Sequence, residues 1–167
     1  MSHYDTNAII IAQICSKIEP GKKMLQKLMY LIGRKGVNLG LNYSIHYFGP
    51  YSSKLDTTMH TLESYDKLII DTTGSTHIIR LGEVSIEGTL DEHTQTAVDF
   101  VMNNFSTKSA HELEAITTLD YVANSILVNP VQDSDIVDKV IQIKGSKFSN
   151  YYLNECLKEL KQLKFIV

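Results

Sequence analysis

The segment from Lys22 to Arg34 constrains the fold most, because helix breakers bound it on both sides. Pro20-Gly21 precedes it and Gly36 follows it. At ~100° per residue, its apolar side chains gather about 140–240° away from Lys23 on a helical wheel. These side chains are Leu25, Leu28, Met29 and Ile32. We therefore predict an amphipathic helix over residues 22–34 that buries this side in a core.

The opposite side of the same helix is basic. Lys23, Lys27, Tyr30 and Arg34 fall within an arc of about 60° and form what we call the basic stripe. A helix side that serves stability alone usually mixes Glu with Lys, yet residues 21–54 contain no acid. We interpret the basic stripe as an exposed docking site for an acidic partner. A plain solvated polar side is the alternative interpretation.

The charge of the whole chain is segregated along the sequence. The formal net charge is only −3, but residues 1–54 carry seven basic and two acidic side chains. Residues 55–138 carry three basic and fifteen acidic ones, and residues 139–167 carry six and two. The near-neutral total therefore excludes a general nucleic-acid coat protein but conceals a polarised molecule.

The remaining pattern predicts a single domain over residues 1–167 with an α+β, mostly helical fold and a small antiparallel sheet. A first helix is expected from Asp5 or Thr6 to Ile18, and a strand over residues 43–48 that Gly49-Pro50 ends. A hairpin is expected over residues 68–81, and the order of elements makes the N-terminal half resemble a winged helix. Further helices are expected to start at Ser53, Asp91, Ser109, Asp133 or Ser134, and Ser149, with a break at Pro130.

An aromatic segment follows the predicted strand. Residues 46–53 read His-Tyr-Phe-Gly-Pro-Tyr-Ser-Ser, and Pro50 fixes the backbone where strand meets helix. We assign this segment to the partner-binding site together with the basic stripe. A rigid elbow whose aromatic rings fill the core is the structural alternative. The assigned residues are Tyr47, Phe48, Gly49, Pro50, Tyr51 and Ser52.

Two segments carry a family resemblance. The first is residues 23–31, Lys-Met-Leu-Gln-Lys-Leu-Met-Tyr-Leu, and the second is residues 46–55, which include Gly49-Pro50-Tyr51-Ser52 and end at Leu55. They resemble the pattern of YwgA-like proteins, which are similar to the Panacea antitoxin-domain superfamily. The resemblance covers residues 22–70, about a third of the chain. It implies a mostly helical domain, and members are often encoded in toxin–antitoxin pairs or mobile elements. Several neutralise toxins by direct binding, and one branch acts as a protease adaptor.

The sequence lacks the common motifs of catalytic sites. The chain has no Gly-rich phosphate loop and no G-x-S-x-G or H-E-x-x-H motif, and its six His share no metal-ligand spacing. Cys15 and Cys156 lie on apolar helix sides and are expected to be buried, reduced and inert. No cofactor, metal or membrane segment is predicted, and the expected location is the cytoplasm.

We therefore expect a non-catalytic protein-binding domain. The expected partner is a protein with an acidic surface, such as a toxin or a host defence factor. The alternative is a winged-helix-like DNA-binding regulator, in which the basic stripe contacts phosphates and the hairpin at 68–81 is the wing. That hairpin offers few basic residues for such a contact.

Overall fold

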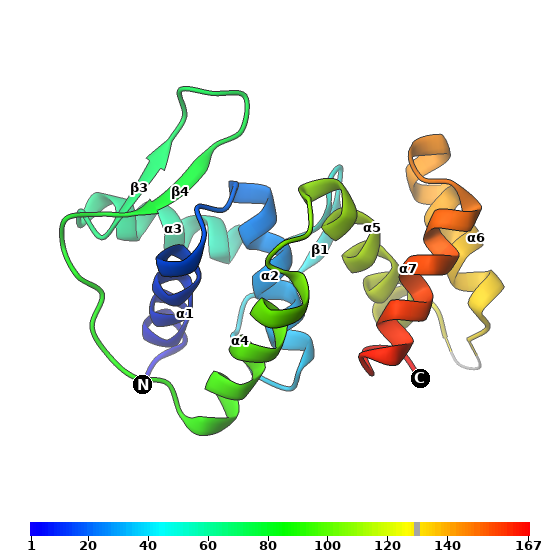
Figure 1. Cartoon of the computed structure of the whole chain (residues 1–167), viewed down its shortest axis with the longest axis horizontal. Helices are drawn as coiled ribbons and strands as arrows, with labels where there is room; N and C mark the ends of the chain where they lie inside the picture. Colours follow the sequence, from blue (N-terminus) through cyan, green and yellow to red (C-terminus); the bar gives the residue numbers. More distant parts are fainter. Residues whose placement is uncertain (129–130) are drawn as a thin grey trace.

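Helices form most of the protein in the computed structural model, which describes residues 1–128 and 131–167 (Figure 1). The mostly helical α+β fold is as predicted. A π-helical turn, η1 (Val122–Ile126), extends α5, and a short 3-10 helix, η2 (Gly145–Lys147), joins α6 to α7. The α-helices of the described residues are α1 (His3–Lys17), α2 (Lys22–Arg34), α3 (Ser53–Ser64), α4 (Glu92–Phe105), α5 (Ala110–Tyr121), α6 (Asp133–Lys144) and α7 (Asn150–Gln162).

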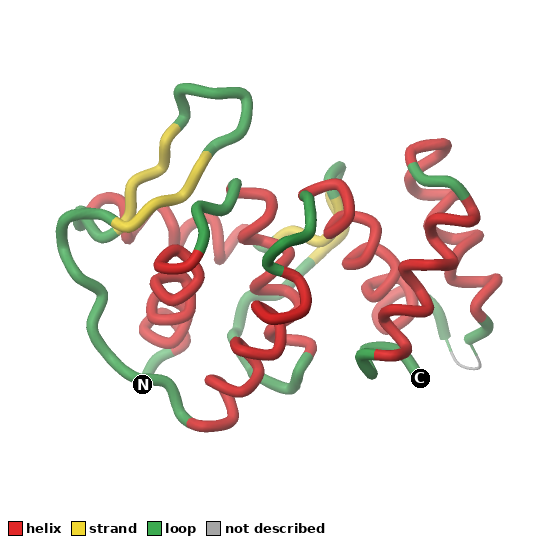
Figure 2. Tube along the Cα trace, viewed as in Figure 1, coloured by secondary structure: helices red, strands yellow, loops and turns green. Residues whose placement is uncertain are grey.

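The strands of the described residues form two separate antiparallel pairs rather than the one small sheet expected. The predicted hairpin is confirmed as β3 (Leu68–Asp71) paired with β4 (Ile78–Leu81), and it projects from the helical body (Figure 2). The prediction that Gly49-Pro50 ends the first strand is wrong. β1 (Ser44–His46) ends earlier, and Gly49 begins β2 (Gly49–Tyr51), which pairs back onto β1. Tyr47 and Phe48 therefore form the turn of a tight hairpin.

Side-chain caps begin several helices where the sequence predicted them, and two starts differ. Ser2 rather than Asp5 caps α1, and Asp5 completes the capping box as its third residue. Ser52 rather than Ser53 caps α3, because its hydroxyl accepts a hydrogen bond from the backbone N–H of Leu55. The predicted break at Pro130 lies outside the described residues. The confirmed caps are Asp91, Ser109 and Ser149.

Helix α2 lies at the centre of the molecule, against α4, α5 and β2 (Figure 1). The four apolar residues that the periodicity placed in the core, Leu25, Leu28, Met29 and Ile32, are fully buried in a single hydrophobic cluster that draws residues from every α-helix. Its polar side is also covered, because α5 packs there and α6 and α7 in turn pack on α5. The central position of α2 decides what its basic residues can do.

Candidate functional site: a lysine–aromatic surface

The basic stripe is not an exposed face, and for Tyr30 and Arg34 the reason is Asp120 on α5. The Tyr30 hydroxyl donates to Asp120 Oδ2 at 2.6 Å, and Arg34 Nε lies 2.7 Å from the same oxygen. Asp120 and Tyr30 are buried and Arg34 is half-buried. Burial raises the pKa of the Asp120 carboxyl, although Arg34 and Tyr30 stabilise its charged form. These two stripe residues therefore join α2 to α5.

Lys27 also faces the interior, which corrects the prediction that it is exposed. Only 3% of its surface is accessible to solvent. Its ammonium donates a hydrogen bond to the Pro50 carbonyl at 3.2 Å. Burial lowers the pKa of Lys27 to about 8, against a weaker opposing effect of the Glu114 carboxylate. Lys27 thus carries a charge that the protein compensates only in part.

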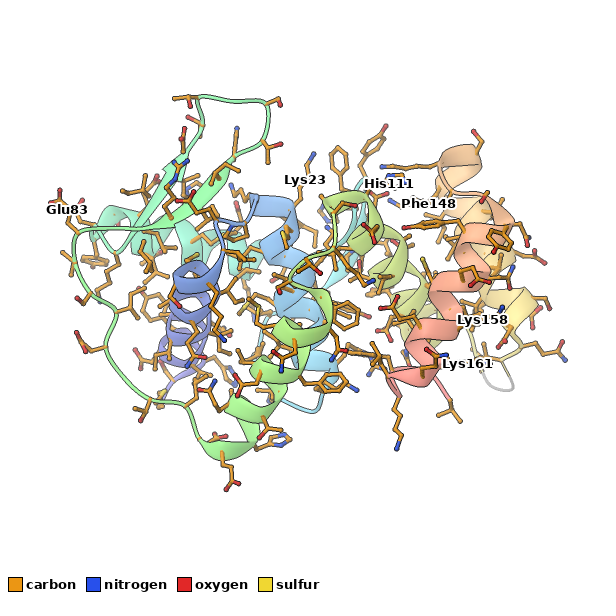
Figure 3. All side chains as sticks on the ribbon, in the orientation of Figure 1. Lys23, Glu83, His111, Phe148, Lys158 and Lys161 are labelled. Atoms are coloured by element: carbon orange, nitrogen blue, oxygen red, sulfur yellow. The ribbon has the colours of Figure 1, made fainter. Side chains whose placement is uncertain are left out.

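Lys23 is the member of the basic stripe that the structure leaves exposed. Its Nζ lies 3.2 Å from the centroid of the Phe48 ring, in a cation–π contact. Figure 3 shows Lys23 at the upper side of the molecule, in the first turn of α2. One basic residue of α2 therefore meets the aromatic hairpin at the surface.

The turn between β1 and β2 presents two aromatic rings to solvent. Tyr47 is 81% exposed and Phe48 is 39% exposed, and the rings meet edge to face with centroids 4.8 Å apart. Gly49 follows with φ +100°, and a Cβ there would lie 3.0 Å from Thr118 Oγ1. Glycine at this position allows the hairpin to lie close against α5.

The other predicted binding residues of this segment support the hairpin from below. Gly49 and Pro50 are buried, and the buried Ser52 donates to the Leu41 carbonyl besides capping α3. Tyr51 is half-buried and stacks on His46 with centroids 4.6 Å apart. The assignment of Gly49, Pro50 and Ser52 to direct contact with a partner is therefore corrected, because all three residues are buried.

Two lysines from the C-terminal part of the chain complete this surface, and the sequence analysis did not find them. Lys147 Nζ lies 2.8 Å from Glu114 Oε1 and 5.1 Å from the Phe48 centroid. Lys144, whose side chain is only 5% exposed, pairs with Glu114 at 3.3 Å and donates to the Tyr47 carbonyl, so it supports the surface from beneath. The two basic blocks of the sequence therefore meet here. We call Lys23, Lys144, Lys147, Tyr47 and Phe48 the lysine–aromatic surface.

A cavity of about 500 Å³ opens beside this surface, between α2, the β1–β2 hairpin and the loop that joins β3 to β4. Lys22, at its edge, is neutralised by Asp56 at 2.7 Å. Other residues that line the cavity are Lys23, Lys27, His46, Phe48, Tyr51 and Thr76. Its walls are mainly apolar and aromatic, with ammonium groups among them, which is typical of a binding site.

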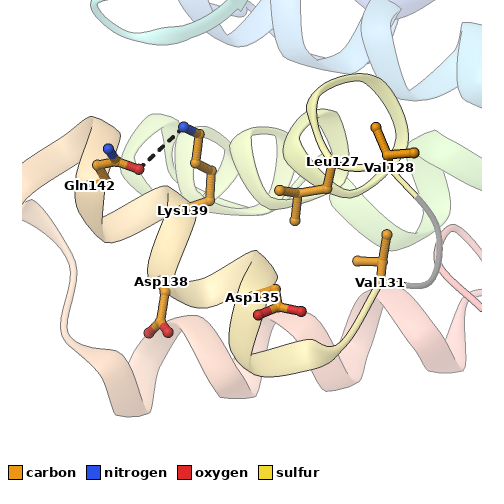
Figure 4. Close-up of a pocket in the computed structure, with 7 residues that line it drawn as sticks. All are labelled: Leu127, Val128, Val131, Asp135, Asp138, Lys139 and Gln142. Atoms are coloured by element: carbon orange, nitrogen blue, oxygen red, sulfur yellow. Dashed lines mark hydrogen bonds between the residues drawn. The ribbon is translucent and has the colours of Figure 1, made fainter.

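A second hollow lies between α6 and the residues Leu127 and Val128 that follow η1 (Figure 4). Its volume is about 280 Å³, and Lys139 and Gln142 hydrogen-bond to each other along α6 at 3.2 Å. Asp135 and Asp138 also line it, so its charge is opposite to that of the larger cavity. It is smaller and has no buried charged group, which makes the lysine–aromatic surface the stronger candidate.

The β3–β4 hairpin bears on the DNA-binding alternative. Its single Arg80 lies 2.6 Å from Asp71 and 2.9 Å from Glu19, so both carboxylates already neutralise the guanidinium. Lys27 and Tyr30 of the basic stripe are buried and out of reach of a phosphate backbone. The basic groups that would contact DNA phosphates in this alternative are therefore largely buried or already paired with carboxylates of the protein.

The described residues offer few groups suited to catalysis. Within residues 1–128 and 131–167, no group of three or more His, Cys, Asp or Glu side chains is placed to hold a metal ion. Both cysteines are free and buried, and burial raises the pKa of Cys156 and raises that of Cys15 to about 12. None of the helices in the described part of the chain has the length and apolar character needed to cross a membrane.

Comparison with known proteins adds no assignment. No protein-family model matches the chain, and no curated protein matches it.

Proposed function

We propose that this chain is a non-catalytic protein-binding domain, antitoxin-like and of the kind carried by mobile elements, which docks an acidic partner protein in the cytoplasm. The single observation that carries the proposal is the lysine–aromatic surface. It places two exposed aromatic rings among three lysines that come from α2, α6 and η2. The family resemblance of residues 22–70 suggests the same class of function.

The aromatic rings suit a binding contact because they are exposed and held in place. Tyr47 and Phe48 pack on each other, and Lys23 and Lys147 lie over Phe48. Aromatic residues of this kind dominate the energy of many protein interfaces. A ring that is already ordered loses little side-chain entropy on binding, so the hairpin turn is a favourable anchor.

The charge of the surface indicates the chemistry of the partner. Lys144 and Lys147 pair with one carboxylate, Glu114, and Lys27 and Lys23 add two further charges close by, which leaves an excess of positive charge. Such a surface attracts an acidic protein and speeds its association at low ionic strength. The partner therefore presents carboxylates around an apolar contact.

The test is capture of the partner from the native host by tagged protein, with two variants beside the wild type. Lys23→Glu combined with Tyr47→Ala changes exposed positions of the lysine–aromatic surface. Tyr151→Ala combined with Lys158→Glu is the matched control, because both residues are exposed on α7, and Figure 3 shows Lys158 far from Lys23. The partner should be retained by the wild type and the control and lost with the first variant.

Equal recovery with all three proteins would contradict the proposal. If the captured partner is a toxin, co-expression with the wild type should restore growth of the host cell. Co-expression with the Lys23→Glu, Tyr47→Ala variant should not restore it. Circular dichroism of each variant shows whether the fold is intact.

A further inference from the structure

The cavity beside the lysine–aromatic surface contains a charge that the protein leaves without a full counter-ion. Lys27 lines the cavity, and its ammonium has three N–H donors. Among the described residues one of these donors has a partner, the Pro50 carbonyl, and no carboxylate oxygen lies within 4.0 Å of Nζ. A buried ammonium in this state is stabilised by an anion that reaches it.

The neighbouring carboxylates are already committed to other lysines. Glu114 pairs with Lys144 and Lys147, and Asp56 pairs with Lys22. Lys23, at the mouth of the cavity, lies over the Phe48 ring rather than beside an acid. The cavity therefore presents two ammonium groups, from Lys23 and Lys27, that have no acidic partner in the described part of the chain.

The walls restrict the kind of anion that fits. His46, Phe48 and Tyr51 contribute ring surface, and the volume of about 500 Å³ suits a bulky side chain. The cavity has no guanidinium among its lining residues, whereas phosphate recognition commonly uses the bidentate arginine fork. An apolar group that carries a carboxylate matches both the walls and the charge.

We infer that the cavity binds the C-terminal residue of the partner protein, with the free carboxylate at Lys27 and the apolar side chain against Phe48 and Tyr51. A terminal residue joins a carboxylate and a large apolar side chain at one Cα. This inference rests on the proposed function and specifies which part of the partner enters the site.

The probe is N-acetyl-phenylalanine, which reproduces a C-terminal residue, and the control ligand is its amide, N-acetyl-phenylalaninamide. Each is titrated into the full chain and followed by NMR. The acid should produce saturable shifts at His46, Phe48 and Thr76 and should raise the pKa of the Lys27 ε-amino group. The amide should bind at least tenfold more weakly, because it lacks the charge that Lys27 compensates.

The variants separate the role of Lys27 from that of the apolar walls. Lys27→Met should weaken the acid at least tenfold and leave the weak binding of the amide unchanged. Lys23→Glu, at an exposed position, provides a second charge variant that does not touch the core. The control Lys158→Glu should bind the acid as the wild type does.

Equal affinity for the acid and the amide would overturn the inference, as would tight acid binding to Lys27→Met or the absence of saturable binding. Inorganic phosphate that binds more tightly than the acid would assign the cavity to a different anion. None of these results decides the proposed function, which the capture experiment with the Lys23→Glu, Tyr47→Ala variant tests. Loss of the partner with the Lys23→Glu, Tyr47→Ala variant would still support the docking surface.

Discussion

The charge on Lys27 costs the fold stability, and its removal should make that cost measurable. The pKa of this amine falls from 10.5 in the unfolded chain to about 8 in the folded protein because the side chain is buried. One pKa unit corresponds to about 1.4 kcal/mol, so the charged form costs about 3 kcal/mol at pH 7. Lys27→Met keeps an unbranched side chain and removes this cost. It also loses the hydrogen bond to Pro50, and that loss cancels roughly 1 kcal/mol of the gain in stability. The variant should therefore be about 2 kcal/mol more stable at pH 7.

The pH dependence gives this prediction its sign. Between pH 8 and 10.5 the unfolded chain keeps a proton on Lys27 that the folded protein has lost, so the stability of the wild type rises with pH in this window. The advantage of Lys27→Met should consequently shrink by about 2 kcal/mol between pH 7 and pH 9.5. Other titrating groups are shared by the two proteins, and most of their contribution cancels in the difference.

Urea unfolding followed by circular dichroism at both pH values measures the difference directly. Lys158→Met is the control, because Lys158 is exposed and its replacement should leave stability nearly unchanged at both pH values. The reasoning is refuted if Lys27→Met is no more stable than the wild type at pH 7, because the lost hydrogen bond is worth only about 1 kcal/mol. It is also refuted if the difference grows with pH, because Lys27 would then be held mainly by attraction to Glu114.

Three further predictions concern stability and reactivity. Asp120→Asn should lower the free energy of unfolding by about 2–4 kcal/mol in urea titrations, because it leaves Arg34 without its buried counter-charge; an unchanged midpoint would contradict this role. Gly49→Ala should lower it by about 1–3 kcal/mol because of the positive φ and the close approach to α5, and a shift towards greater stability would disprove the strain. Cys15 and Cys156 should react with a thiol reagent far more slowly in the folded protein than in urea, since burial raises both thiol pKa values, and equal rates would show that the thiols are accessible.

Much of the fold follows from local sequence signals. The breakers around residues 22–34 gave the bounds of α2, and the caps at Asp91, Ser109 and Ser149 gave the starts of later helices. The β2 strand could not be found in this way. Gly49-Pro50 is a typical strand-ending pair in the local sequence, and only its pairing with β1 makes it part of a strand. Strand pairing depends on partners that a local pattern does not contain.

The sequence predicted some residues of the candidate site, and it missed those whose position depends on non-local contacts. A helical wheel groups Lys27, Tyr30 and Arg34 on one side of α2, but it does not reveal that α5 covers that side. The decisive residue, Asp120, lies 90 positions away from Tyr30 in the sequence. The exposed aromatic turn of residues 47–48 was included in the predicted site. The basic C-terminal block was the signal that could have indicated Lys144 and Lys147.

The central claim is that the lysine–aromatic surface binds an acidic protein, and the affinity of the purified pair tests it most directly. Calorimetric titration of the identified partner should give a Kd at least tenfold weaker for the Lys23→Glu, Tyr47→Ala variant than for the wild type, a loss of about 1.4 kcal/mol or more. The affinity for the wild type should also fall as salt rises, because exposed charges steer the contact. The control Tyr151→Ala, Lys158→Glu should match the wild type. Equal Kd values for the wild type and the surface variant would contradict the account.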